Sequence, residues 1–128
     1  MRVLADTHAF FWWVIDSAKL SAKARALFAD QDNDILVSPV VAWELATKVR
    51  LGKWPDALRA ATDIASIIKE NNFTAFAVTI EHARAAGFLP GSHRDPFDRL
   101  LAAQSQIEGI PLITADPVFR SFGTAVMW

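Results

Sequence analysis

Short apolar runs alternate along the chain with longer stretches in which apolar residues recur every third or fourth position. The short runs are too brief for helices and are rich in Val, Ile and Leu, as buried strands are. Strands are therefore predicted at Arg2–Ala5, Ile35–Val37, Phe73–Val78, Pro111–Thr114 and Thr124–Trp128. Helices are predicted at Thr7–Ile15, Ala22–Ala29, Pro39–Leu51, Ala57–Asn71, Ile80–Gly87 and Pro96–Glu108, with a further helical turn after Asp116.

Most of the predicted helices begin after a residue that is suited to cap them. Ser21 and Thr79 are such residues, and Ser38 and Asp95 each precede a proline, which is favoured at the first helical position. Asp56 is assigned the same role for the helix that starts at Ala57. Strands that alternate with helices predict an α/β fold with a central parallel sheet and helices on both faces.

Composition limits the class of protein further. The 128 residues fit one domain over 1–128, and a 52% hydrophobic content is ample for one core. A net charge of −1 argues against a protein that coats nucleic acid through bulk positive charge. The chain has no cysteine, which excludes disulfides and zinc–thiolate sites. No signal peptide is evident, and the longest apolar run has seven residues, so we expect a cytoplasmic protein without a membrane partner.

Four acidic residues fall where the predicted sheet would place them together. Asp6 and Asp116 follow the first strand and the Pro111–Thr114 strand, whereas Glu44 lies in the second turn of its helix and Asp98 in the first turn of its own. In a parallel sheet, strand ends and helix starts share one edge, where ligands bind. We therefore expect these carboxylates to converge there.

Converging carboxylates repel one another unless a cation lies between them. Oxygen ligands favour Mg²⁺ or Mn²⁺, and two such ions ~3.5–4 Å apart would clamp a phosphodiester during hydrolysis by water. Asp6, Asp98 and Asp116 are predicted to be metal ligands, and Glu44 a ligand or general base. Singly, each residue has a simpler interpretation: Asp116 as a cap, or Glu44 paired with Lys48 across one helical turn.

Four stretches resemble a known family when taken together. They are VLADTHAFFWW, SPVVAWELATKVRLGK, HRDPFDRLLAAQSQ and PLITADPVF, and they span the whole chain in order. The chain resembles a PIN-domain ribonuclease of the VapC type, the toxin of VapBC toxin–antitoxin pairs. The resemblance implies a PIN-like fold and a metal-dependent endoribonuclease whose four acids are Asp6, Glu44, Asp98 and Asp116.

The resemblance also implies neighbouring residues and partners. Thr7 and Thr114 resemble hydroxyl residues beside the acids, and Asp95 would be a cap or a residue behind the metal ligands. Arg99 is a candidate for a substrate phosphate or for a salt bridge, and His93 and Arg94 are candidates for RNA contact. The implied partners are an RNA substrate, a cognate antitoxin and a second copy of the chain in a homodimer.

Some features leave alternatives open. Some of the aromatic residues Phe10, Phe11, Trp12 and Trp13 are expected to lie inside the domain. Together they exceed what one helix face buries, and the excess predicts an exposed apolar patch for a protein partner. The other tryptophans are interpreted as core or interface rather than base-stacking residues, and His8 has no assigned role. A metal-dependent nuclease acting on structured DNA, or a non-catalytic α/β binding module, would fit the same pattern. A phosphotransfer receiver or aspartate phosphatase would need a second acid beside Asp6, which the chain lacks.

Overall fold

The computed structural model describes residues 1–128 and contains a five-stranded parallel sheet in the order β3-β2-β1-β4-β5. The strands are β1 (Arg2–Ala5), β2 (Asp34–Val37), β3 (Thr74–Ala75), β4 (Leu112–Ile113) and β5 (Val126–Met127). The helices are α1 (Thr7–Val14), α2 (Ala22–Ala29), α3 (Pro39–Arg50), a 3₁₀ turn η1 (Pro55–Ala57), α4 (Leu58–Thr62), α5 (Ile64–Glu70), α6 (Ile80–Phe88), α7 (Pro96–Glu108) and α8 (Val118–Ser121). The predicted α/β fold is confirmed.

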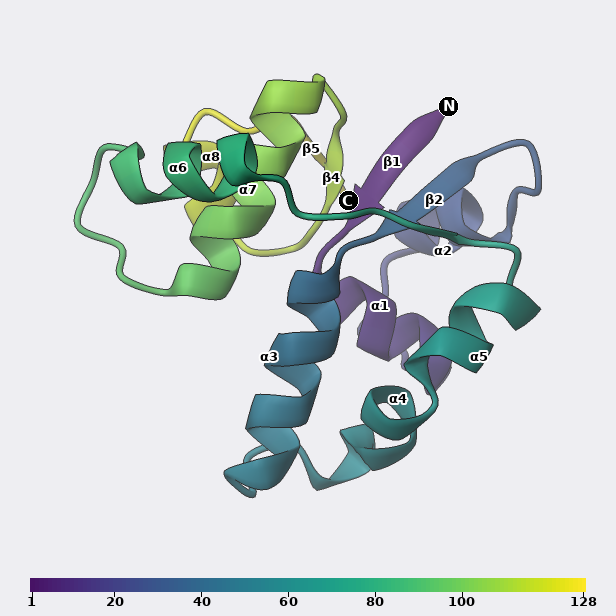
Figure 1. The fold of residues 1–128 in the computed structure, drawn as a ribbon. Coiled ribbons are helices and arrows are strands. Elements are labelled where there is room, and N and C mark those ends of the chain that lie inside the picture. The colour runs from purple at the N-terminus through teal and green to yellow at the C-terminus, as the bar shows by residue number, and fades with distance from the viewer.

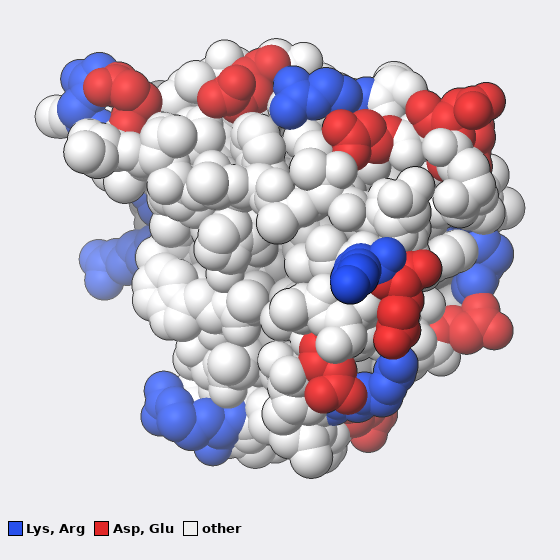
Figure 2. Space-filling view, turned by 45° about the vertical axis from the view of Figure 1, so that its right-hand side comes forward, with Lys and Arg blue, Asp and Glu red and all other residues white.

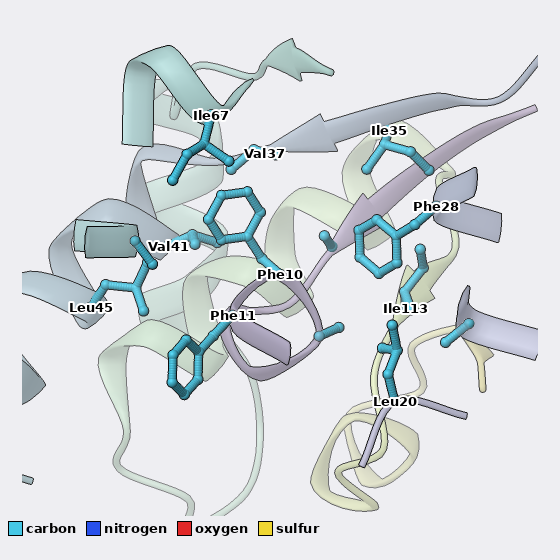
Figure 3. Close-up of a cluster of buried hydrophobic side chains, with 14 of the residues drawn as sticks. Phe10, Phe11, Leu20, Phe28, Ile35, Val37, Val41, Leu45, Ile67 and Ile113 are labelled. Carbon is cyan, nitrogen blue, oxygen red and sulfur yellow. The ribbon is translucent and has the colours of Figure 1, made fainter. Parts of the chain in front are cut away.

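Alternation along the strands creates two cores. Val3 and Ala5 face one side of the sheet and pack with the helices α1 to α5, whereas Leu4 faces α7 and α8. Figure 1 shows the same division, with α6, α7 and α8 on one side of the strands and α1, α3, α4 and α5 on the other. In Figure 3, Phe10 of α1 lies among side chains from β2, α3 and α5. Burial on both faces explains the uninterrupted apolar runs Val3–Ala5 of β1 and Ile35–Val37 of β2.

The helix boundaries follow the predicted caps. The side chains of Ser21, Ser38, Thr79 and Asp95 accept hydrogen bonds from backbone N–H groups at the starts of α2, α3, α6 and α7. Gly109 ends α7 with a φ of 64°, in the left-handed region that glycine occupies without strain. No helix combines the length and apolar content needed to span a membrane.

The single helix predicted from Ala57 to Asn71 is wrong. The structure has η1, α4 and α5 there, and Asp56 lies inside η1 without capping it. The Thr62 hydroxyl donates to the Leu58 carbonyl oxygen at 2.9 Å, a local bond of the kind that bends helices, and α4 ends at this residue.

The predicted exposed aromatic patch on the first helix is also wrong. Phe10 and Phe11 are buried, and Trp12 and Trp13 are half-buried against the core. Trp13 stacks on Phe28, with ring centroids 5.3 Å apart. The aromatic residues fit because α1 has the sheet on one side and α3 on another, so more than one of its faces is covered.

Candidate active site

The four predicted acids lie at the carboxyl edge of the sheet or at the helix starts beside it. Asp6 follows β1 and caps α1, where its Oδ1 accepts a hydrogen bond from the Ala9 N–H at 2.7 Å. Glu44 lies in the second turn of α3, and Asp98 in the first turn of α7. Asp116 follows β4, and its Oδ1 accepts from the Val118 N–H at 3.0 Å, although the N-cap residue of α8 is Pro117.

Burial strongly perturbs Asp6. The residue is 5% exposed, and burial raises the pKa of its carboxyl from 3.8 to about 7. The charges of Asp98 and Glu44 raise the pKa further, while hydrogen bonds from Thr114 and from the Ala9 N–H lower it. The charged form of the Asp6 carboxyl is therefore strongly disfavoured unless a cation is nearby.

The other acids are coupled to Asp6 and to one another. Burial is also the main cause that raises the pKa of Glu44, and Asp95 and Asp98 raise it further. Burial raises the pKa of Asp98, with further increases from Asp95 and Asp116. Asp98 and Glu44 thus act on Asp6, Asp98 acts on Glu44, and Asp116 acts on Asp98. We therefore treat Asp6, Glu44, Asp98 and Asp116 as one electrostatic group, which we term the acidic cluster.

The tightest group of possible metal donors is a different one. Atoms of His93, Asp95 and Asp98 lie within 4.8 Å of one another, and Asp98 is the only member of the acidic cluster among them. His93 Nε2 lies 2.8 Å from Asp98 Oδ2. From sequence, His93 is a candidate only for RNA contact, because a histidine in a loop carries no periodicity that indicates its neighbours.

The two threonines lie beside the acids. The Thr114 Oγ1 accepts from the Asp116 backbone N–H at 3.0 Å, and the Thr114 hydroxyl is near enough to Asp6 to lower the pKa of its carboxyl. The Thr7 hydroxyl is near enough to Glu44 to lower its pKa, but no partner of its buried Oγ1 meets hydrogen-bond geometry. A buried polar atom without a partner is uncommon and points to a missing ligand.

Asp95 and Arg99 stabilise the start of α7 and the loop that carries His93. Asp95 caps α7 by accepting from the Phe97 N–H at 2.8 Å. The Arg99 guanidinium donates to four backbone carbonyls between Ala86 and His93, including that of His93 at 2.9 Å. This geometry directs Arg99 toward the loop that carries His93, and it does not favour the predicted contact with a substrate phosphate.

These residues fit a hard divalent cation. Carboxylate oxygens are the ligands that Mg²⁺ and Mn²⁺ prefer, and those of Asp6, Glu44 and Asp98 lie at buried or partly buried positions with raised pKa values, whereas Asp116 is exposed. The unpartnered Thr7 hydroxyl adds an oxygen that a bound ion, or a water on it, would satisfy. Lys48 is the one cation in contact with the acidic cluster, and its Nζ lies 3.9 Å from Glu44 Oε2.

Comparisons with known proteins identify the family. Residues 3–124 match the model of the PIN domain, and the chain belongs to the PIN domain family. No curated protein sequence matches it.

Three solved structures are similar over nearly the whole chain. VapC20 from Mycobacterium tuberculosis, described as a Sarcin-Ricin loop cleaving toxin, is 19% identical over 96% of both chains, with a TM-score of 0.71. VapBC2 from Rickettsia felis, bound to a DNA fragment from its promoter, is 18% identical over 99% of this chain and 98% of the other, with a TM-score of 0.69. FitAcB from Neisseria gonorrhoeae is 18% identical over 100% and 97%, with a TM-score of 0.67. At this identity the likeness concerns the fold.

Proposed function

We propose that the protein is an endoribonuclease that depends on Mg²⁺ or Mn²⁺ and acts as the toxin of a type II toxin–antitoxin system. The observation that carries the proposal is the acidic cluster at the carboxyl edge of the sheet, with Asp6 buried and a threonine hydroxyl left without a partner. The similarity to VapC20, VapBC2 and FitAcB supports the toxin assignment.

We assign each side chain of the site a role from its position. Asp6, Asp98 and Asp116 would hold the metal ion, which supplies positive charge for the phosphodiester and lowers the pKa of the attacking water. Glu44 accepts the proton of that water, a role that suits a carboxyl whose pKa is raised. His93 orients Asp98 through their hydrogen bond, and Arg99 holds His93 in place through its carbonyl.

A cleavage assay tests this function. Purified protein is incubated with single-stranded RNA in Mg²⁺, in Mn²⁺ or in excess chelator. We expect cleavage with either metal, none in chelator, and a loss of at least ~10²-fold in Asp98→Asn, since a misplaced ion removes the main electrostatic stabilisation. Asp32→Asn, on an exposed side chain, is the matched control. Equal cleavage in chelator, or full activity of Asp98→Asn, contradicts the proposal.

The same assay separates the alternatives. A nuclease for structured DNA would cleave branched or nicked duplexes in preference to RNA, although the same acids would serve. A non-catalytic module would cleave neither substrate, and titration with Mn²⁺ would show no binding at the acidic cluster. The raised pKa of Glu44 favours catalysis over inert binding. Carboxyls with pKa values perturbed by burial and by neighbouring charges are typical of active sites.

The protein surface offers room for the proposed protein partners. A hollow of about 420 Å³ is lined mostly by apolar side chains of α3, α5 and the segment around β3, among them Ile64, Ile68 and Phe76. Figure 2 views the molecule with the α5 side turned forward, and the centre of that face carries few charged side chains. Ile80 and Phe88 of α6 are more than 80% exposed. We assign such surfaces to the antitoxin and to a second copy of the chain.

The partner assignment predicts that a neighbouring gene encodes a small antitoxin, and co-expression with that small protein tests it. A stable complex that no longer cleaves RNA is expected, and the isolated protein should sediment as a dimer. A monomer whose activity is unchanged by that small protein refutes the assignment.

A further inference from the structure

A second cavity lies next to the acidic cluster and has a different chemistry. Its volume is about 230 Å³, and it lies between α1 and the segment that links α3 to α4. We term it the indole pocket, and its lining includes His8, Trp12, Lys19, Lys53, Trp54 and Asp56. The volume is below the ~300–1,000 Å³ typical of sites for drug-sized ligands. It therefore suits one planar group rather than a whole cofactor.

Aromatic rings surround this space. The His8 ring centroid lies 4.7 Å from that of Trp54 and 5.3 Å from that of Trp12. Phe11 stacks behind Trp54 with an interplanar angle of 5° and fixes the indole. Of the five tryptophans, only Trp13 donates its indole N–H to another side chain, so the N–H groups of Trp12 and Trp54 are free for a ligand.

Lysines surround the same rings. Lys19 Nζ lies 6.0 Å from the ring centroid of Trp12, and Lys48 Nζ lies 5.4 Å from that of Trp54. Lys53 is exposed at the mouth, and Asp56 is the only acid in the lining. Lys19 and Lys53 outnumber the one acid of the lining, so the pocket carries a local excess of positive charge, which favours a chain of phosphates passing its mouth.

The indole pocket adjoins the acidic cluster. His8 follows Thr7 in the first turn of α1, and Lys48 contacts both Trp54 and Glu44, with its Nζ 3.9 Å from Glu44 Oε2. A strand whose phosphate lies at the acids would thus bring a neighbouring nucleotide to the rings.

We propose that the indole pocket binds one unpaired base of the RNA beside the phosphodiester that is cleaved, with the base packed against the rings of His8, Trp12 and Trp54 that line it and adjacent phosphates contacted by Lys19 and Lys53. The inference rests on the proposed ribonuclease function. Splayed, unstacked bases are how single-stranded RNA is recognised, and aromatic rings accept any base because every base has a π face. The lysines and the adjoining acids favour RNA over an apolar peptide side chain.

A binding experiment with an abasic probe tests the proposal. All proteins carry Asp116→Asn to prevent cleavage, and the probes are fluorescein-labelled octaadenylate and a series in which one base at a time is removed. With Trp54 present, we expect removal of one particular base to weaken binding about tenfold, which corresponds to about 1.4 kcal/mol. In Trp54→Ala, the intact probe should bind about tenfold more weakly, and removal of that base should cost nothing further.

Matched substitutions outside the pocket distinguish a loss of base binding from a general loss of structure. Trp43→Ala removes an exposed indole outside the pocket and should leave both affinities unchanged. Lys53→Gln should weaken binding and reduce its salt dependence, whereas Lys23→Gln, on the exposed surface of α2, should do neither.

The outcomes are distinct. If the Asp116→Asn protein binds no octaadenylate at all, the ribonuclease function itself fails. If it binds but every abasic probe behaves alike, or Trp54→Ala weakens intact and abasic probes equally, the base-binding role is overturned. If Trp54→Ala weakens binding of the antitoxin and not of RNA, the pocket belongs to the protein partner instead.

Discussion

Replacing Asp6 by asparagine is expected to stabilise the metal-free protein while destroying its site. Burial raises the pKa of Asp6 from 3.8 to about 7, so the wild type unfolds more easily once this carboxyl is charged. The shift of about three pKa units corresponds to roughly 4 kcal/mol at 1.36 kcal/mol per unit. Asparagine carries no charge, and its Oδ1 still accepts the Ala9 N–H that now bonds to Asp6 at 2.7 Å, so the cap of α1 is kept.

The sign of the pH dependence follows from the direction of the shift. A carboxyl with a raised pKa contributes its full stability below pH 3.8, and the contribution is lost as the pH rises through about 7. The free energies of unfolding of wild type and Asp6→Asn should therefore agree near pH 3.5 and separate progressively up to pH 8, with the variant more stable by up to about 4 kcal/mol.

Urea unfolding in excess chelator, followed by circular dichroism at several pH values, measures this difference. In saturating Mn²⁺ the wild type should instead be more stable than Asp6→Asn, because the ion stabilises only the protein that binds it. Asp32→Asn is the matched control on an exposed side chain and should track the wild type at every pH. An Asp6→Asn protein that is no more stable than wild type at pH 8, or that keeps the same pH dependence, would refute the reasoning.

Three further substitutions probe separate parts of the molecule. Glu44→Gln should fold normally and slow RNA cleavage ~10²–10⁴-fold in steady-state kinetics, the contribution of a general base; a loss below tenfold contradicts that role. Arg99→Ala leaves four backbone carbonyls without their donor and should lower the free energy of unfolding by ~1–3 kcal/mol while raising KM; unchanged urea midpoints would show that the loop does not depend on Arg99. Phe10→Ala opens a cavity in the core between the sheet and α3 and should cost ~3–5 kcal/mol in the same measurement, whereas an effect under 1 kcal/mol would place Phe10 outside the core.

Local sequence signals predicted the fold because they agreed with the tertiary structure. Short apolar strands and capped helices such as the one that begins after Ser38 need little information from distant residues. The break after Thr62 could not be predicted, because a side-chain bond to the Leu58 carbonyl decides it and the apolar periodicity continues across it. The extent to which the four aromatic residues of α1 are buried could not be predicted, because the number of faces that α1 buries depends on where α3 packs.

The candidate site was predictable in part for the same reason. Strand ends and helix starts could be located from sequence, so Asp6 and Asp98 could be assigned to one edge of the sheet. His93 and Arg99 could not be assigned, since their partners are set by the path of the loop that joins α6 to α7. The indole pocket was missed because Trp54 lies far in sequence from the rings of α1 that face it.

The position of a bound ion tests the central claim most directly. Crystals grown with Mn²⁺ and measured at an X-ray energy where manganese scatters anomalously would locate the ion without reference to activity. We predict an anomalous peak coordinated by the carboxylates of Asp6, Asp98 and Asp116, and its disappearance in Asp6→Asn crystals. A peak held only by His93 and Asp95, or no peak near the sheet edge at saturating Mn²⁺, would contradict the account.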